Sequence, residues 1–307
     1  MKKRLFATGM GGCVGHYLYD ELKNPDDVDL TFLIRSPEKL KYDSSNINII
    51  RDQFKNIKKY GNIIKESDYV IHLLADWGGE EGNFQETIDL FGCIDPQKTE
   101  KILYFSTASI LGKNNIPAKE ALGCGTPYIR GKYKMHEELL RMPHYSRTVV
   151  LYPTWVLGGD EKHPYSHATT AIKQTVKWLG LIKRFSIDIT FHFMHSRDIA
   201  LTSAHILNSD IRSGEFVLGN AAVTADYFIK AVCKETGTKD SRFKIRVPVE
   251  LLRKTAALFG KKLNDWDNYC IDNRNTVYNV TNPATFGITP EFDTAEKVLK
   301  EIFRKNA

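Results

Sequence analysis

Short apolar runs alternate with amphipathic stretches through the first half of the chain, and this alternation limits the fold more than any other feature. The apolar runs lie at residues 4–8, 30–34, 47–50, 69–74, 102–105 and 149–152. Helical patterns lie between most of them, at residues 14–22, 54–64, 84–93 and 128–142. Short runs separated by helices are the pattern of a parallel sheet covered on both faces. The sequence therefore predicts an α/β fold with a doubly wound parallel sheet.

The second half of the chain loses this regularity after Pro153. Helical patterns at residues 168–179 and 225–236 and a short apolar run at residues 216–218 are irregularly spaced. Asp293, Thr294 and Glu296 resemble a helix N-cap with its capping-box glutamate, so a last helix is predicted to begin there. A chain of 307 residues is also longer than one compact core usually is. We therefore expect a second, smaller lobe on the C-terminal side.

Composition and charge exclude several classes of protein. Hydrophobic residues make up 42% and charged residues 26% of the chain, which is ordinary for a globular protein. The net charge of +6 is scattered among acids, so no nucleic-acid partner is expected, and an anionic small ligand explains the excess as well. No apolar run reaches the ~18 residues of a membrane span, and the apolar stretch after the basic start is too short for a signal peptide.

The cysteines and histidines form no disulfide or metal pattern. Five cysteines, widely spaced and without a CxxC pair, predict free thiols in a reducing cytoplasm. The HxxxH spacing of His163 and His167 can place two ligands on one helical face, but Pro164 spoils that helix. His192 and His195 lie in a strand-like stretch. We therefore expect hydrogen-bonding histidines and no metal.

A glycine-rich stretch, ATGMGGCVGHYLYDEL, follows the first predicted strand and opens the first predicted helix. Its glycines are spaced GxxGxxG, with one further glycine in the first gap. Glycines allow a tight turn and close approach of a pyrophosphate, whose charge then meets the free N–H groups of the helix N-terminus. In this position the loop predicts a dinucleotide site. Its predicted cofactor contacts are Gly9, Gly11, Gly12, Cys13, Val14 and Gly15.

The end of the second predicted strand, LTFLIRSPEKL, distinguishes the two nicotinamide cofactors. An acid there would accept hydrogen bonds from the ribose 2′-hydroxyl, but Ile34 and Arg35 offer no acceptor. An arginine can instead bind a 2′-phosphate with charge-assisted hydrogen bonds. NADP is therefore favoured over NAD, with Arg35 as the selecting residue. A solvated surface role for Arg35 is the alternative.

Motifs along nearly the whole chain resemble those of the extended short-chain dehydrogenase/reductase family, also called the NAD-dependent epimerase/dehydratase family. In chain order they are TGMGGCVG at 8–15, RDQ at 51–53, IHLLA at 71–75, NFQET at 83–87, FSTASILG at 105–112, YIRGK at 128–132, PTWVLG at 153–158 and HSRDIA at 195–200. YxxxK alone is a weak signal, but the motifs occur in family order. The resemblance implies a dinucleotide-binding Rossmann domain at 1–158, with a returning segment at about 190–220. Residues 159–189 and 221–307 would form the smaller substrate-binding lobe.

The resemblance also implies roles for single residues. Tyr128 would exchange the hydroxyl proton, Lys132 would tune it and hold the nicotinamide ribose, and Thr107 would hydrogen-bond the carbonyl oxygen. Tyr128 and Lys132 are four residues apart, so on a helix they share one face. An ammonium ~4 Å from a phenolate contributes about 4 kcal/mol at an effective dielectric of 20, enough to lower the tyrosine pKa from ~10 by 2–3 units. Further implied cofactor contacts are Asp52, Gln53, Leu74, Ala75, Asp76, Pro153, Thr154 and Trp155.

The same residues serve reductases, nucleotide-sugar epimerases and nucleotide-sugar dehydratases in this family. Ala108 and Ser109 stand where sugar dehydratases carry an acid pair. Thr154 stands near a frequent Asn and Tyr152 near a frequent Arg of nucleotide-sugar enzymes. These replacements remove usual donors and make a sugar diphosphate substrate less favoured. A homodimer through the helix that carries Tyr128 is a further implication.

The loop at residues 75–83, ADWGGEEGN, has the glycine content of a mobile flap over the nicotinamide. Trp77 in this loop and Trp155 near the predicted mouth suggest an apolar or aromatic carbonyl substrate, although either tryptophan can equally be core. The predicted substrate contacts are Trp77, Asn83, Thr107 and Trp155. The leading hypothesis is an NADPH-dependent reductase of a ketone or aldehyde. A nucleotide-sugar epimerase with tightly bound NAD and a non-catalytic NADP-binding protein are the alternatives.

Overall fold

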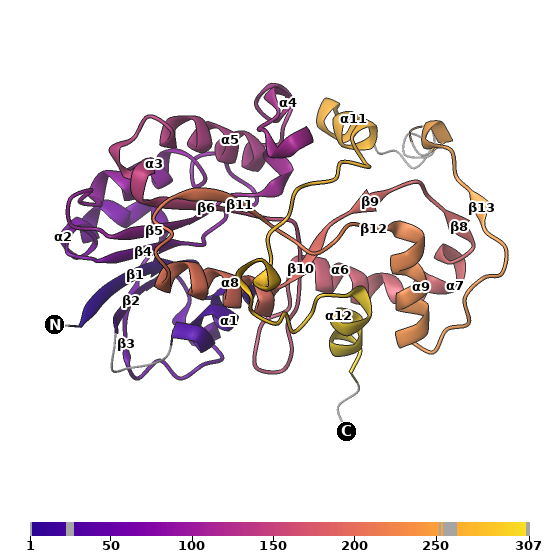
Figure 1. Cartoon of the computed structure of the whole chain (residues 1–307), viewed down its shortest axis with the longest axis horizontal. Coiled ribbons are helices and arrows are strands. Elements are labelled where there is room, and N and C mark those ends of the chain that lie inside the picture. Colours follow the sequence, from indigo (N-terminus) through magenta and orange to yellow (C-terminus); the bar gives the residue numbers. More distant parts are fainter. Residues whose placement is uncertain (1, 23–27, 252, 254–262, 305–307) are drawn as a thin grey trace.

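A computed structural model describes residues 2–22, 28–251, 253 and 263–304 of the protein (Figure 1). Its main sheet has seven strands in the order β11-β6-β5-β4-β1-β2-β3, and all neighbouring strands are parallel. The strands are β1 (Lys3–Thr8), β2 (Val28–Ile34), β3 (Ile47–Arg51), β4 (Tyr69–His72), β5 (Lys101–Phe105), β6 (Thr148–Pro153) and β11 (Gly214–Leu218). The predicted doubly wound α/β fold is therefore confirmed.

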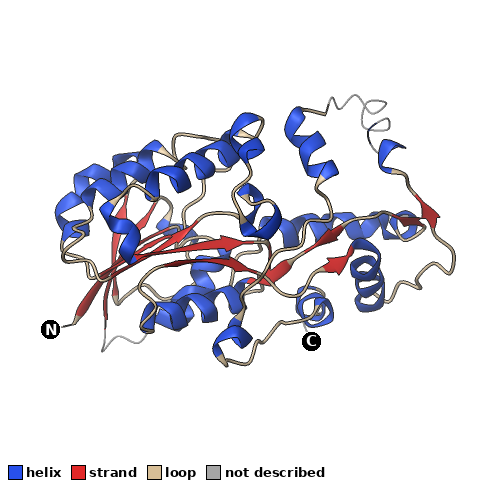
Figure 2. Ribbon diagram, turned by 45° about the horizontal axis from the view of Figure 1, so that its top comes forward, coloured by secondary structure: helices blue, strands red, loops and turns tan. Residues whose placement is uncertain are grey.

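Helices cover both faces of this sheet (Figures 1 and 2). One face carries α1 (Cys13–Leu22) and α8 (Ser196–Asn208), and the opposite face carries α3 (Gln85–Cys93) and α5 (Pro127–Leu139). Each layer has its own apolar core, with Leu18 and Ile199 in one and Leu90 and Leu139 in the other, all buried. Burial on both faces explains why the central strands read as continuous apolar runs rather than as alternating ones.

The strand order reverses between β1 and β4, which are neighbours in the sheet. At such a switch point the loops after the two strands diverge to opposite faces and leave a crevice at the carboxyl edge. The glycine-rich loop follows β1, and the segment beginning at Leu73 follows β4. The fold therefore brings the predicted cofactor residues to one edge.

A second group of elements lies at the other end of the molecule (Figure 1). Its strands form two-stranded sheets, in which β7 (Trp155–Leu157) pairs with β10 (Phe193–His195), β9 (Thr190–Phe191) with β12 (Val223–Thr224), and β8 (Phe185–Ser186) with β13 (Ile245–Arg246). Its helices are α6 (His167–Thr175), α7 (Leu179–Ile182), α9 (Ala225–Glu235), α11 (Asp265–Asp272) and α12 (Ala295–Ile302). A third apolar cluster, which includes Phe193, Phe228 and Leu299, packs these elements together.

Several predicted elements differ in detail from the structure. The predicted helix at 54–64 is a 3₁₀ helix η2 (Phe54–Tyr60) followed by α2 (Gly61–Lys65), and the one at 168–179 continues from α6 through η6 (Val176–Trp178) into α7. The N-cap of α12 is Thr294, whose hydroxyl accepts from Lys297 N, so the predicted capping box is wrong by one residue. Short connecting helices are η1 (Pro37–Lys39), η3 (Ala108–Ile110), η4 (Lys113–Asn115), α4 (Lys119–Gly123), η5 (Pro143–Arg147) and η7 (Pro283–Phe286).

None of the helices in the described ranges is both long enough and apolar enough to cross a bilayer.

Candidate active site

The glycine-rich loop is shaped by two glycines that no other residue could replace without movement. Gly9 has a φ of +81°, and a side chain there would put its first carbon 2.6 Å from the backbone of Leu73. A side chain at Gly15 would come within 2.5 Å of the backbone of Met10, because α1 packs closely on the loop. A Cβ placed on Gly11 or Gly12 would have no neighbour closer than 3.4 Å. The loop therefore combines a fixed frame with an open surface at its turn.

This arrangement fits a dinucleotide. The open backbone at Gly11 and Gly12 immediately precedes α1, which begins at Cys13, so the free N–H groups of the first turn lie beside it. Val14 is half-buried in the same turn, while the Cys13 thiol lies 3.1 Å from the Ser196 hydroxyl, and burial raises its pKa to about 12. Cys13 is thus a neutral packing residue, and its predicted contact with the cofactor would be through its backbone.

Helix α5 carries both Tyr128 and Lys132 on its buried face. It begins after Thr126, whose hydroxyl accepts from Ile129 N, and Pro127 occupies its first turn, where a missing N–H is no loss. Lys132 is fully buried, and its Nζ donates to Phe105 O at 2.9 Å and to Leu74 O at 3.4 Å. These carbonyls lie just after β4 and at the end of β5. Lys132 therefore ties α5 to the carboxyl edge of the sheet.

Burial opposes the predicted electrostatic effect of Lys132 on Tyr128 in the protein without a cofactor. Burial raises the pKa of Tyr128 to about 12, and a hydrogen bond with the Thr107 hydroxyl only partly opposes this. Burial also lowers the pKa of Lys132 to about 7. A lysine that has lost its proton well before the tyrosine ionises cannot stabilise the phenolate by its charge. A charge that enters the site with a ligand would change the pKa of both groups.

Thr107 lies directly beyond the end of β5, next to Tyr128. It is buried, and its hydroxyl accepts from Ser109 N at 3.2 Å as the cap of η3. The same hydroxyl hydrogen-bonds to the Tyr128 phenol. The structure thus brings together the three residues predicted to be catalytic.

Trp77 lies over Tyr128. The two rings stack with centroids 4.8 Å apart and an angle of 25°, and Trp77 is 64% exposed. His167, the first residue of α6, makes an edge contact with the indole at a centroid distance of 5.5 Å. His167 is therefore a site neighbour that sequence reasoning did not select. Its sequence signal, a histidine shortly after a Gly-Gly pair, was not specific enough to choose it.

Contacts with α5 hold the loop at residues 75–84. The Glu80 carboxylate pairs with Arg130 at 2.9 Å and with Lys134 at 2.6 Å, both on α5. A side chain at Gly131 would come within 2.8 Å of Glu80 O, which explains why glycine stands inside the YxxxK motif. Opening of the predicted flap around Glu80 would have to break these contacts, and its mobility stays a prediction.

Asn83 organises this loop and does not reach the site. Its Nδ2 donates to Asp76 O at 2.6 Å and Gly79 O at 2.7 Å, and its Oδ1 accepts from Asp76 N at 3.2 Å. The side chain is fully buried. With its donors already used, Asn83 has nothing to offer a substrate, so that prediction is corrected. Asp76 is held in turn by its own contact with Gly78 N at 3.1 Å.

The cofactor contacts predicted after β3, Asp52 and Gln53, differ in their surroundings. Both oxygens of Asp52 are engaged, by Gln53 N and Asn56 Nδ2 on one side and by the Tyr60 hydroxyl on the other, each at 2.7 Å. These hydrogen bonds hold the pKa of Asp52 well below its usual range. Asp52 is therefore tied to two side chains of η2, and a cofactor contact by its carboxylate would have to displace one of these partners. Gln53, the residue preceding η2, is exposed.

Arg35 follows β2 directly and is exposed to solvent. No ion pair or hydrogen bond of Arg35 occurs within the described ranges. Arg35 lies near the glycine loop at the switch-point edge. A Cβ placed on Gly11 would be 3.9 Å from the side chain of Ile34, the residue before Arg35. Its guanidinium is therefore accessible to an anion.

The residues predicted after β6 turn toward the second group of elements. Pro153 ends β6, and the Thr154 hydroxyl donates to Leu218 O at 2.8 Å. The ring of Trp155 packs on Phe191 at 5.2 Å and Phe228 at 5.7 Å, and the residue remains 39% exposed. Trp155 thus belongs to the aromatic wall of the smaller lobe and does not stack with Trp77.

The histidines have hydrogen-bonding roles. His192 accepts from Tyr278 N at 3.0 Å, and its other ring nitrogen lies 2.7 Å from Asn220 O. His163 lies 2.8 Å from Asp160 and 2.9 Å from Asp20. Among the described residues no three side chains of His, Cys, Asp or Glu are arranged to hold a metal ion. All five cysteines are free.

The fold and this arrangement define the class: a Rossmann-like α/β protein with a glycine loop at the switch point and a Thr, Tyr and Lys set at the neighbouring strand ends. The chain belongs to the NAD dependent epimerase/dehydratase family, whose model matches residues 5–219. Comparison with curated proteins gives no significant match.

Solved structures of this family have similar folds. A UDP-N-acetylglucosamine 4-epimerase from Methanobrevibacter ruminantium aligns with a TM-score of 0.67 and 20% identity over 99% of this chain and 98% of its own. A dTDP-glucose 4,6-dehydratase from Bacillus anthracis in complex with NAD gives 0.70 and 16% over 98% and 96%. A UDP-glucose 4-epimerase from Thermotoga maritima gives 0.69 and 16% over 98% and 97%. At these identities the likeness supports the fold, and it does not determine the reaction.

Proposed function

We propose that the protein is an NAD(P)-dependent enzyme that transfers hydride at a carbon bearing a hydroxyl or carbonyl group. Two contacts carry this proposal: the Tyr128 phenol hydrogen-bonds to Thr107, and Lys132, on the buried face of the same helix, donates to Phe105 O at the end of β5. When bound, the nicotinamide would supply or accept the hydride. Tyr128 would give or take the hydroxyl proton, and Thr107 would orient the reacting oxygen by a hydrogen bond.

Lys132 would act differently from the simple charge effect expected at first. Its ammonium is oriented by Phe105 O and Leu74 O, so it sits next to the segment where the cofactor ribose is proposed to bind. A pKa of about 7 places its proton exchange near neutrality. We infer that it holds the ribose hydroxyls and passes a proton toward Tyr128 through them. Leu74, Ala75 and Asp76 would contact the cofactor from the same side.

Two reactions are proposed in order of support. An epimerase acting on a nucleotide-linked sugar comes first, because the family model and the similar folds solved with NAD or nucleotide sugars favour it. A reductase of a ketone or aldehyde comes second, favoured by Thr154 and by the exposed aromatic ring of Trp77 above Tyr128. Ala108 and Ser109 cannot supply the acid and base that a sugar dehydration needs.

The choice of cofactor follows a separate observation. Arg35 is exposed at the end of β2 and is available to a 2′-phosphate, so NADP remains our proposal over NAD. A homodimer that packs through α5 is proposed from the family resemblance.

The retained nucleotide distinguishes the two reactions. An epimerase reduces and reoxidises its cofactor within one cycle, so the purified protein should release bound NADP(H) or NAD(H) when it is denatured. A reductase should be purified without nucleotide and should oxidise added NADPH in the presence of a carbonyl compound. Chromatography of the extract together with an assay on UDP-sugars and on a panel of ketones gives the answer.

The same assay tests the role of Tyr128. Tyr128→Phe should lower turnover by roughly 10²–10⁴-fold, because the proton donor is lost, while dinucleotide affinity stays within about twofold. Unchanged turnover would reject the mechanism. A variant that loses both turnover and dinucleotide affinity would indicate a structural effect of the missing hydroxyl.

A further inference from the structure

Two segments of the smaller lobe carry an unusual concentration of positive charge. Residues 177–186, KWLGLIKRFS, and residues 239–247, KDSRFKIRV, hold seven basic and one acidic side chains. Their formal charge of +6 equals that of the whole 307-residue chain. The rest of the protein is therefore neutral in sum, and its positive charge is concentrated in these two segments, which we call the basic aromatic patch.

The two segments lie side by side. Strands β8 and β13 pair in parallel, with Ile245 opposite Phe185 and Arg246 opposite Ser186. Ile245 N donates to Arg184 O at 2.8 Å, and Lys183 Nζ donates to Lys239 O at 2.6 Å. Helix α7 leads directly into β8. Figure 1 places α7, β8 and β13 at the end of the molecule farthest from β1 to β3.

Several large apolar side chains of this patch are exposed to solvent. Phe243 is 82% exposed, Ile245 65%, Trp178 59% and Leu181 54%. Phe243 lies in the bend just before β13, and Ile245 is the first residue of that strand. Lys244 between them pairs with Asp226 on α9 at 3.7 Å. Trp178 and Leu181 are three residues apart and share one side of the helical turn. The segment that leads into β13 and the helical turn thus each present apolar side chains to solvent.

Several of the charges around these side chains lack a counter-charge. Lys177, Arg184 and Arg242 have no ion-pair partner within the described part of the chain, and Arg184 and Arg242 are exposed. Arg246 is exposed as well, near Asp188. Exposed Trp, Phe, Leu and Ile among Lys and Arg suit the interface of an anionic bilayer, where apolar groups enter the headgroup region and cations bind lipid phosphates. A nucleic acid would use the cations but would leave Leu181 and Ile245 without partners.

We propose that the basic aromatic patch binds the surface of a membrane containing anionic phospholipids. The protein lies on the bilayer through this end of the smaller lobe and does not span it. The inference is independent of the reaction at Tyr128.

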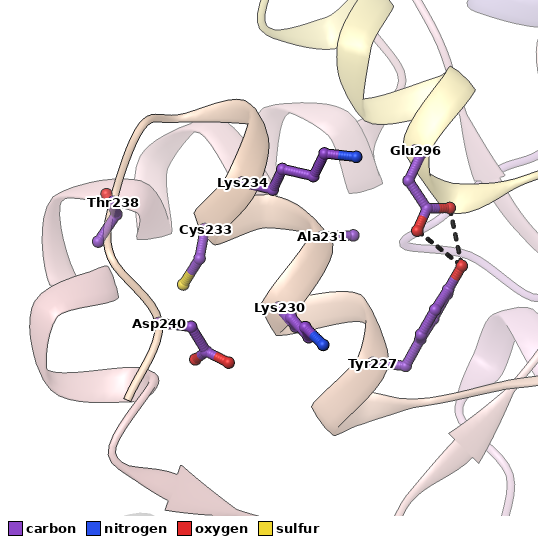
Figure 3. A pocket seen from close by; sticks show the side chains of 8 residues that line it. All are labelled: Tyr227, Lys230, Ala231, Cys233, Lys234, Thr238, Asp240 and Glu296. Atoms are coloured by element: carbon purple, nitrogen blue, oxygen red, sulfur yellow. Dashed lines mark hydrogen bonds between the residues drawn. The ribbon is translucent and has the colours of Figure 1, made fainter. Parts of the chain in front are cut away.

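A cavity next to the patch is not part of this proposal. It has a volume of about 370 Å³ and lies along α9 (Figure 3). Lys230 and Lys234 line it, but so do Asp240 and Glu296, and Glu296 accepts from the Tyr227 hydroxyl at 2.7 Å. With two cations and two carboxylates the cavity has no charge preference for a phosphate.

Vesicle co-sedimentation of the full-length protein tests the proposal. The protein should sediment with vesicles of phosphatidylcholine mixed with phosphatidylglycerol, remain in solution with pure phosphatidylcholine, and bind less at high salt. Phe243→Ser with Ile245→Ser should weaken binding about tenfold or more, and Arg184→Gln with Arg242→Gln by about 20-fold. Leu140→Ser and Lys55→Gln, at exposed positions outside the patch, are the matched controls.

Circular dichroism and dinucleotide binding show that each double variant is folded. Equal sedimentation of wild type and both double variants would overturn the proposal. So would tight binding to a single-stranded nucleic acid that only the arginine variant weakens, which would identify an electrostatic nucleic-acid surface. A dimer in solution that Phe243→Ser with Ile245→Ser dissociates would instead assign the patch to a second copy of the chain.

Discussion

At the scale of single residues, the glycines of the cofactor loop divide into two kinds. Gly9 and Gly15 are required by packing, since a side chain at either would overlap the backbone of a neighbouring segment. Gly11 has room for a side chain, with its nearest neighbour 3.9 Å away. A requirement at Gly11 would therefore come from a ligand and not from the fold.

The pair Gly11→Ala and Gly15→Ala separates these requirements. Gly15→Ala should lower the free energy of unfolding by about 1–3 kcal/mol, because α1 has to move away from Met10. Gly11→Ala should leave the unfolding free energy within about 0.5 kcal/mol and still weaken dinucleotide binding several-fold. Chemical denaturation and a fluorescence titration with NADH and NADPH measure both quantities. Unchanged dinucleotide affinity of folded Gly11→Ala would contradict the proposed cofactor site.

Lys132 is a second residue whose environment gives a measurable result. Its pKa is lowered by burial to about 7, against ~10.4 for an unfolded chain. Between these values the unfolded state binds one more proton, so stability rises with pH across this window, by at most about 1.4 kcal/mol per pH unit. Below pH ~7 the lysine is protonated in both states, and its contribution no longer changes.

The substitution Lys132→Met removes this dependence while keeping most of the side-chain volume. The unfolding free energy of the wild type minus that of Lys132→Met should therefore rise as the pH increases from about 7 to about 10. Urea denaturation of both proteins at several pH values measures the difference, and Lys55→Met, at an exposed lysine, is the control. A difference that stays constant over this range would show that Lys132 keeps its proton in the folded protein.

At the scale of elements, the sequence predicts what depends on local pattern. The predicted limits of the strands at the sheet centre agree with the structure within about two residues. Burial on both faces makes these strands continuous apolar runs, such as ILYF in β5, which are recognisable in the sequence. The loop after β1 was predictable for the same reason, since glycine spacing and the following helix are neighbours in sequence. Elements whose limits depend on cap geometry, such as the start of α12, were misplaced.

Contacts between distant segments could not be read from the sequence. Glu80 and Arg130 are 50 residues apart, and nothing in either segment indicates that they pair. Glu80 belongs to the loop that also carries Trp77, whose ring stacks on Tyr128. Asn83, predicted to contact the substrate, instead supports this loop from within.

The anchor of this loop can be loosened without touching Tyr128. Glu80→Gln should lower the free energy of unfolding by no more than about 1 kcal/mol, since the ion pairs are partly exposed. Amide hydrogen exchange at residues 76–84 should nevertheless become several-fold faster. Glu138→Gln, which removes an exposed pair between α5 and Arg141 just beyond its end, should leave that exchange unchanged. Equal exchange in both variants would show that packing on Gly131 alone fixes the loop.

At the scale of the whole molecule, the C-terminal segment joins the two groups of elements. The Asp198 carboxylate at the start of α8 accepts from Glu291 N at 2.8 Å and Phe292 N at 2.9 Å, just before α12. We propose that the domains divide as the family resemblance implies, into 1–158 with about 190–220 and into 159–189 with 221–307. In that division α8 is the element of the first domain that holds the end of the second.

Arg197, next to Asp198, connects this junction to α1 by ion pairs. Its guanidinium lies 2.7 Å from Glu21 on α1, 3.1 Å from Glu291 and 3.9 Å from Asp20. Arg197→Gln removes the cation that lies between Glu21 and Glu291, so the unfolding free energy should fall by about 1–2 kcal/mol at low salt. The loss should shrink at high salt, because ions screen charges that are partly exposed to solvent. Denaturation of both proteins at low and high salt measures it, and a loss independent of salt would show that Arg197 acts by packing alone.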